Sequence, residues 1–145
     1  MNVCKNLVKY LKIEDKVEFT GVMTQGQFVN ELKDCLAYVQ HSIRDELGDM
    51  EGTPVSILEA SAAGVPVIST FHAGIPEVIH HKKTGLLVNE HDVEGMAKNM
   101  LVLLRDKAMA KKLGETGKKL ISEEFSMEKH IACFDKLFAE LTDKQ

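Results

Sequence analysis

Two glutamates eight positions apart, Glu51 and Glu59, are the residues of this sequence best suited to bind a polar ligand. Glu59 is the one charged side chain in a run of apolar or small residues, 55–63, that is typical of a buried helix. A buried carboxylate is unfavourable unless a donor satisfies it, and a ligand hydroxyl is one candidate donor. Glu51 lies in the preceding loop beside Gly52, which has no side chain to block a ligand.

The start of that helix lies between the two glutamates. Thr53 is a suitable N-cap, and Pro54 suits the first helical position because its missing N–H would have no partner there. Gly64 suits the C-terminal end. Free amides and the helix dipole make a helix start an anion site, which suits a diphosphate. A sugar nucleotide would place its phosphates there and its sugar and ribose hydroxyls on the carboxylates.

The spacing of the glutamates supports a second interpretation equally well. Glu51 could be a solvated loop residue, and Glu59 could be bonded to another protein group at the rim of the core. Both interpretations need the same helix at 55–63.

Helical and strand-like segments alternate along most of the chain, which predicts a parallel sheet with helices on its faces. The expected helices are 2–11, 25–36, 55–63, 76–81 and 92–104, the last with Asp92 as N-cap, and the expected strands are 17–20, 37–40, 65–69 and 86–88. Residues 106–144 are expected to be helical, with interruptions at Gly114, Gly117 and the junction of Phe125 and Ser126. The fold class is therefore α/β with a Rossmann-like sheet.

Composition narrows the function classes. The chain has 145 residues with 44% hydrophobic residues, enough for one domain. A formal net charge of −4 argues against nucleic acid as a partner. Cys4, Cys35 and Cys133 form no close pair, so neither a disulfide framework nor a metal site is expected. With no apolar run of membrane-spanning length and no export signal, we expect a cytoplasmic location.

The segment from Glu51 to Val88 contains an ordered set of motifs that resembles a known family. It reads EGTPVSILEASAAGVPVISTFHAGIPEVIHHKKTGLLV, with an E-x7-E pair followed by G-x-P-V-I, G-I-P-E and T-G-L-L-V. This order resembles family 4 of the retaining glycosyltransferases, which have the two-domain GT-B fold. The resemblance extends from VEFTG at Val17 to FSMEKH near the end, and the GDMEGTP lead-in is similar to members that build bacterial exopolysaccharides.

The resemblance implies that residues 1–145 are a C-terminal nucleotide-sugar-binding domain, incomplete at its N-terminal end and lacking the N-terminal acceptor domain. The full enzyme would transfer a sugar from a UDP-, GDP- or ADP-sugar with retention of configuration, without a protein nucleophile, an obligatory metal or a cofactor. The family's glycine-arginine and lysine pair is not found before Glu14. We therefore expect this chain alone to be inactive.

Carried over residue by residue, the resemblance assigns roles to both glutamates. Glu51 would contact the donor-sugar hydroxyls as the catalytic residue, and Glu59 would contact the ribose. Many members have Gly where this chain has Pro54, so one amide donor is absent. The other donor-binding residues would be Gly52, Thr53, Val55 and Ser56 at the sugar and diphosphate, and Thr20, Gly21 and Val22 at the base.

Two further function classes stay open. The chain could be a non-catalytic nucleotide-binding or interaction module that kept the fold, while a sugar-nucleotide epimerase is a weaker alternative because the E-x7-E pattern belongs to the transferases. His72 lies in a loop beside the predicted sugar site, and we expect it to be a surface loop residue. His80 and His81 are expected to lie in a solvated turn. Met96, Met100 and Leu104 recur at helical spacing and are expected in the core.

The strand order of a doubly wound sheet leads to one more expectation. Two strands that belong between 17–20 and 37–40 would be missing, and unpaired strand edges do not persist. We therefore expect 17–20 either to pair directly with 37–40 or to leave a gap that a second copy of the chain fills.

Overall fold

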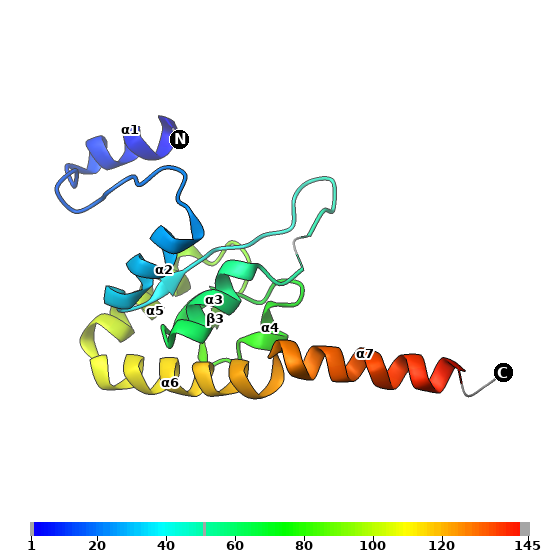
Figure 1. Ribbon diagram of the computed structural model, residues 1–145. Helices are drawn as coiled ribbons and strands as arrows, with labels where there is room; N and C mark the ends of the chain where they lie inside the picture. The colour runs from blue at the N-terminus through cyan, green and yellow to red at the C-terminus, as the bar shows by residue number, and fades with distance from the viewer. Residues whose placement is uncertain (1, 51, 143–145) are drawn as a thin grey trace.

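The protein, described here by a computed structural model for residues 2–50 and 52–142, is an α/β domain with a small parallel sheet flanked by helices (Figure 1). In the described part of the chain the sheet has the order β1-β2-β3. β1 is Tyr38–Val39, β2 is Val67–Thr70 and β3 is Gly85–Val88. Both pairings are parallel, with Tyr38 opposite Val67 and Val67 opposite Gly85.

The helices follow the predicted order closely. The junction after α6 is where the sequence predicts it, because α6 ends at Glu124 with Phe125 as its C-cap. Asp92 is the N-cap of α5, its side chain accepting a hydrogen bond from the Gly95 amide. The helices are α1 Asn2–Leu11, α2 Gln25–Asp34, α3 Val55–Ala63, α4 Ile75–Val78, α5 Val93–Arg105, α6 Lys107–Glu124 and α7 Met127–Thr142.

Helices cover both faces of the sheet, as the Rossmann-like prediction requires. Val67 of β2 belongs to a core cluster that includes residues of α2 and α3, whereas the next residue, Ile68, belongs to a second cluster with α5. Alternate side chains of a strand point to opposite faces. The helix α6 contributes to both clusters, through Ile121 to the first and Leu113 to the second.

The predicted strand at 17–20 is wrong. The structure assigns no strand there, and Val17 and Phe19 are exposed. The α1 helix and the loop that contains this segment lie apart from the sheet (Figure 1). Strand-forming side chains are not sufficient, because a strand also needs a neighbour for its backbone groups. Direct pairing with 37–40 is therefore wrong as well, while pairing with a second copy stays a prediction.

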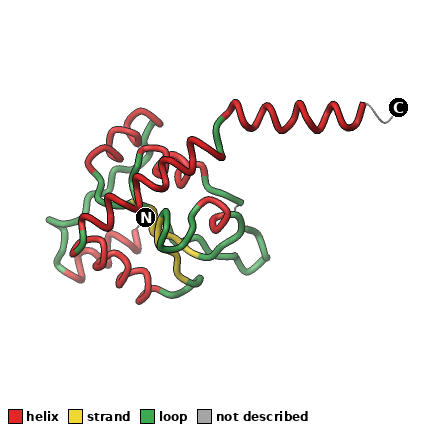
Figure 2. Tube along the Cα trace, turned by 90° about the horizontal axis from the view of Figure 1, so that it is seen from below, coloured by secondary structure: helices red, strands yellow, loops and turns green. Residues whose placement is uncertain are grey.

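The C-terminal helix α7 extends away from the rest of the domain in both views (Figures 1 and 2). None of its residues is buried. In α5, Met96 is buried as predicted, but Met100 and Leu104 are 42% and 58% exposed, so their assignment to the core is wrong. Within residues 2–50 and 52–142, no helix is long and apolar enough to cross a membrane.

The glycines expected to interrupt the last helical segment lie inside the continuous helix α6. A β-carbon at Gly114 would overlap the carbonyl oxygen of Gly64, and one at Gly117 would press on the carbonyl oxygen of Thr84. These glycines therefore let α6 approach the end of α3 and the start of β3 closely. Gly64 itself has φ +84° and caps α3, as predicted.

The close approach at Gly114 predicts that Gly114→Ala destabilises the domain, although alanine is the better helix former. Overpacking of this kind costs about 1–3 kcal/mol, more than the gain in helix propensity. The matched control is Gly26→Ala in α2, where an added β-carbon meets nothing within 4 Å. Urea denaturation should show a lower free energy of unfolding for Gly114→Ala and an equal or higher one for Gly26→Ala. Equal stability of the two variants would contradict the close packing.

Candidate functional site

The start of α3 lies at the carboxyl edge of the parallel sheet, where the long loop after β1 returns to the domain (Figure 1). The helix covers the predicted residues 55–63, but its N-cap is Pro54 and not Thr53, so Pro54 lies just before the first helical position and not in it. Pro54 has ψ 129°, which is extended, and no side chain caps the helix. The hydroxyl of Thr53 lies instead against Gly74, in the turn after β2.

The first amides of α3 are available to a ligand. Among the described residues, neither the Val55 amide nor the Ser56 amide donates a hydrogen bond. The Val55 side chain is 67% exposed, so solvent reaches this end of the helix. The Ser56 hydroxyl donates to Oε1 of Gln40 over 2.9 Å, which leaves its amide as the free group. The helix start thus has the two properties of an anion site, free N–H groups and a favourable dipole.

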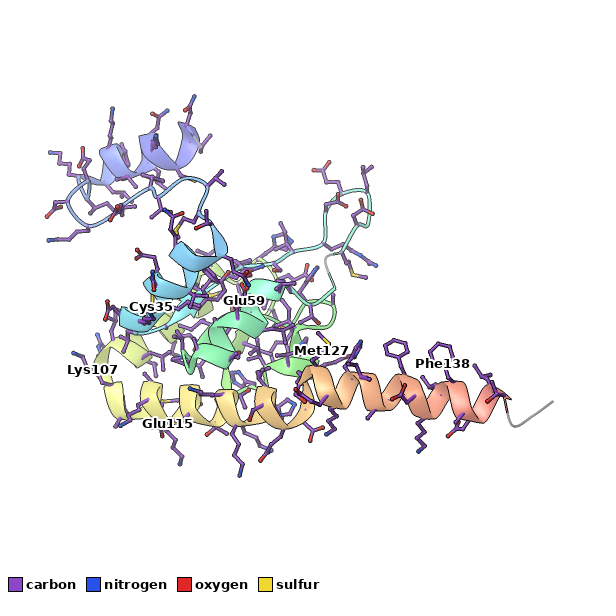
Figure 3. The ribbon with its side chains drawn as sticks, viewed as in Figure 1. Cys35, Glu59, Lys107, Glu115, Met127 and Phe138 are labelled. Atoms are coloured by element: carbon purple, nitrogen blue, oxygen red, sulfur yellow. The ribbon has the colours of Figure 1, made fainter. Side chains whose placement is uncertain are left out.

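Glu59 lies half-buried on α3 beside the start of α2 (Figure 3). The side-chain Nε2 of Gln25 donates to its Oε1 over 3.0 Å, and in the described part of the chain this is the carboxylate's one hydrogen bond. One oxygen of Glu59 is therefore bonded to protein, as the second interpretation of the spacing expected. The other oxygen is left for a further donor.

The contact between Gln25 and Glu59 also places the segment expected to border a base. Thr20, Gly21 and Val22 lie just before Gln25 and are all exposed. Gly21 has φ +70°, a conformation that favours glycine. This loop therefore ends at the start of α2, beside Glu59 of α3.

The loop predicted to face the sugar is only partly described. Glu51, the predicted catalytic residue, lies outside the described residues. The carbonyl of Gly52 accepts a hydrogen bond from the Gly74 amide over 3.3 Å, and Gly52 itself is exposed. The structure thus joins the loop before α3 to the turn after β2.

His72 is not a surface residue, and that prediction is wrong. Its side chain is 1% exposed, and Nδ1 lies 2.7 Å from Oε1 of Glu90. The other oxygen, Oε2, accepts a hydrogen bond from the Arg44 amide over 2.9 Å. The Arg44 amide and, second, the His72 ring lower the pKa of Glu90. A sequence signal existed, because His72 and Glu90 each follow a neighbouring parallel strand by two residues.

The two histidines after α4 differ in exposure: His80 is exposed, as expected for a solvated turn, whereas His81 is not fully solvated. His81 is half-buried, and its Nδ1 accepts a hydrogen bond from the Leu87 amide over 2.9 Å. Burial and, second, the nearby Lys82 lower the pKa of His81. Among residues 2–50 and 52–142, no group of three potential ligands could hold a metal ion.

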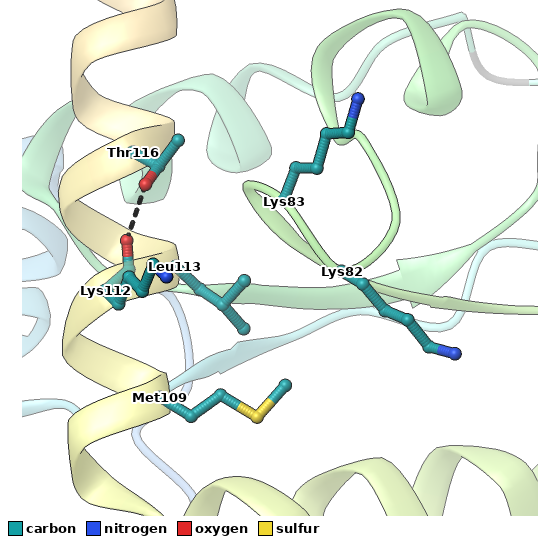
Figure 4. Close-up of a pocket in the computed structure, with 6 residues that line it drawn as sticks. All are labelled: Lys82, Lys83, Met109, Lys112, Leu113 and Thr116. Carbon is teal, nitrogen blue, oxygen red and sulfur yellow. Dashed lines mark hydrogen bonds between the residues drawn. The ribbon is translucent and has the colours of Figure 1, made fainter.

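A cavity of about 460 Å³ opens at the other end of β3 (Figure 4). Lys82 and Lys83 come just before β3, so this cavity lies by the amino end of the strand, whereas ligands of parallel sheets bind at the carboxyl ends. It is therefore separate from the candidate site. Its lining residues are Lys82, Lys83, Met109, Lys112, Leu113 and Thr116.

Comparisons with known proteins identify relatives of most of the chain. The family model described as glycosyl transferases group 1 matches residues 2–120. The putative colanic acid biosynthesis glycosyltransferase WcaL of Escherichia coli K12 is 38% identical over 96 residues, 66% of this chain and 24% of that protein. The N-acetyl-alpha-D-glucosaminyl L-malate synthase of Bacillus anthracis is 33% identical over 93% of this chain and 33% of that protein.

Solved structures show the same fold. Sucrose-phosphate synthase from Thermosynechococcus elongatus matches 98% of this chain and 34% of that chain, with a TM-score of 0.81 and 24% identity. Anabaena Alr3699/HepE in complex with UDP-glucose matches 99% of this chain and 36% of that chain, with a TM-score of 0.78 and 17% identity. The fold is therefore that of the GT-B glycosyltransferases. The chain spans about a quarter to a third of the length of these proteins.

The lowered pKa of Glu90 predicts how acid affects stability. A carboxyl whose pKa is lower in the folded state than in the unfolded state stabilises the fold at pH values above 4.5, its ordinary pKa. This contribution is lost as the pH falls through the folded-state pKa. Between pH 7 and pH 3, the melting temperature of Glu90→Gln should therefore fall less than that of the wild type. The exposed Glu94→Gln in α5 is the control and should follow the wild type. Parallel curves for all three proteins would contradict the role of Glu90.

Proposed function

The chain belongs to the group 1 glycosyltransferase family, and on this premise we propose that it forms the donor-binding domain of a glycosyltransferase. The whole enzyme would transfer a sugar from a nucleoside diphosphate sugar to an acceptor, with retention of configuration. The observation that supports this most directly is the open start of α3, with free amides at Val55 and Ser56 and a half-buried Glu59 one turn further along.

The site has one group for each part of a nucleotide sugar. The free amides suit the diphosphate, since they donate where the helix dipole is positive. The unbonded oxygen of Glu59 suits a ribose hydroxyl, with Gln25 holding the other oxygen. The loop of Thr20, Gly21 and Val22 would border the base. Gly52 and Thr53, with Glu51 as the catalytic residue, would face the sugar.

The extent of the domain and its setting are part of the proposal. Residues 1–145 would be the C-terminal nucleotide-sugar-binding domain of a longer enzyme, completed by an N-terminal acceptor domain. The named relatives support a place in polysaccharide or glycoconjugate synthesis, because WcaL is a putative colanic acid biosynthesis glycosyltransferase. The donor would be a UDP-, GDP- or ADP-sugar, and the reaction would take place in the cytoplasm.

The second candidate is a non-catalytic nucleotide-binding module. It would need only the groups that bind a nucleotide, the start of α3 and Glu59, and no residue at the reacting sugar. Both candidates predict nucleotide binding at α3. They differ in whether a longer protein containing this chain transfers sugar.

The first test of the site is nucleotide binding by the 145-residue chain. We expect weak binding of UDP, GDP or ADP and the corresponding sugars in a calorimetric titration, and no transfer activity. Glu59→Gln should weaken binding by roughly ten- to a hundredfold, because it removes a hydrogen bond to a charged group. Glu115→Gln, on the exposed surface of α6, is the control and should bind as the wild type does.

Two results would count against this assignment. An absence of heat with all these ligands at millimolar concentration would contradict nucleotide binding, and equal affinities for wild type and Glu59→Gln would contradict the site. Turnover by the chain alone would contradict its proposed dependence on an acceptor domain.

A second test separates the two glutamates in a longer protein that contains this chain. Glu51→Gln should lower kcat, because only Glu51 is proposed to lie at the reacting sugar. Glu59→Gln should mainly raise KM for the donor, each effect being roughly ten- to a hundredfold. If both variants had the kcat and KM of the wild type, the roles assigned to the two glutamates would be wrong.

A further inference from the structure

The carboxylate of Glu90 joins the three loops at the carboxyl edge of the sheet. Glu90 itself follows β3, its Oε1 bonds His72 after β2, and its Oε2 bonds the Arg44 amide in the loop after β1. The His72 ring is the buried member of this set, at 1% exposure. The hydrogen-bonded pair of His72 and Glu90 therefore ties the loop after β2 to the loops after β1 and β3.

The turn that follows His72 is both strained and closely packed. Ala73 has φ +41°, a conformation that residues other than glycine rarely adopt. Such strain persists only where the surroundings enforce it, and it is concentrated at functional sites. The next residue, Gly74, donates its amide to the Gly52 carbonyl and has no room for a β-carbon beside the Thr53 hydroxyl. The His72 turn thus supports the loop proposed to face the donor sugar.

The second ring nitrogen of His72 is also informative. Nε2 is buried and has no hydrogen-bond partner among the residues that the structure describes. The Glu90 carboxylate accepts the hydrogen of Nδ1, so Nε2 is not needed to hold the ring in place. A buried polar atom without a partner carries a desolvation penalty, which the imidazole must offset through the bond that its Nδ1 makes to Glu90.

We propose that His72 is a positioning residue of the donor site. Its bond to Glu90 fixes the turn 72–74, and this turn holds the Gly52–Thr53 loop in place for the sugar and diphosphate. This inference rests on the proposed function. It assigns His72 to the sugar end of the donor, away from the nucleoside end at Glu59. The pair should therefore affect the affinity for a nucleotide sugar and leave the affinity for a nucleoside monophosphate unchanged.

The test compares two ligand classes by ligand-detected NMR with the 145-residue chain. The probes are UDP-glucose, GDP-mannose and ADP-glucose, each against its nucleoside monophosphate. His72→Phe keeps an aromatic ring but loses both nitrogens, and His72→Asn keeps a donor near the position of Nδ1. For the nucleotide sugar that the wild type binds, we expect His72→Phe to lower the affinity about tenfold. The affinity for the corresponding monophosphate should fall less than about twofold. His72→Asn should recover most of the affinity.

Two further variants make the comparison specific. The exposed His80→Phe is the matched control and should bind both ligand classes as the wild type does. Glu90→Leu should reproduce the loss, and the double variant His72→Phe, Glu90→Leu should be no weaker than either single variant, because the two residues act as one unit. Melting temperatures show which variants are folded. If His72→Phe does not fold, the comparison of His72→Asn with Glu90→Leu and the wild type still tests the inference.

The possible outcomes separate this inference from the proposed function. If the wild type binds none of the ligands, the proposed function fails and the inference fails with it. If the wild type binds but His72→Phe and Glu90→Leu bind equally well, only the inference is overturned. An equal loss for nucleotide sugar and monophosphate would also overturn it, because that is the result of a general structural role.

Discussion

Strand β2 is buried along its whole length, and the hydrogen bonds that satisfy its polar side chains fix the carboxyl edge of the sheet. The Ser69 hydroxyl donates to the Gln40 carbonyl over 2.7 Å, and the Thr70 hydroxyl donates to the Ser42 carbonyl over 2.6 Å. Both hydroxyls are fully buried and would be costly without these partners. The same bonds hold the start of the long loop after β1, which leads to the candidate site.

The position of α3 follows from contacts at its two ends. Near its start, the Ser56 hydroxyl bonds the Gln40 side chain, so the helix is tied to the segment that β2 already holds. At its end, the left-handed Gly64 lies against Gly114 of α6. With both ends fixed, the first two amides of α3 bond no other described residue, and Glu59 stays within reach of Gln25. Protein contacts thus prepare the site without occupying its amides.

Local signals in the sequence were sufficient for most of the helices and for the three strands of the described sheet. Asp92 and Gly64 mark helix ends through their own chemistry, and a run of apolar residues indicated the strand β2. Segment 17–20 was mispredicted because a strand also depends on a partner that its own residues do not reveal. The interruption predicted at Gly114 was wrong for a related reason, since a glycine in a helix can serve close packing as well as termination.

The candidate site shows the same limit. The α3 start and Glu59 could be predicted because one helix contains both. The burial of His72 depends on Glu90, 18 positions away, and on the parallel pairing that brings the ends of β2 and β3 together. Similarly, the Thr53 hydroxyl lies against the turn at Gly74 and does not cap the helix. Local propensity does not encode such a contact between two loops.

Amide NMR shifts of the isotope-labelled chain test most directly the proposal that a nucleotide sugar binds at the start of α3. During titration with UDP-, GDP- and ADP-sugars, we expect the largest changes in amide chemical shift at Val55 and Ser56. Smaller changes should occur at Gly21 and Gly74. Shifts confined to the cavity around Lys82 and Lys112, or no shifts at millimolar ligand, would contradict it.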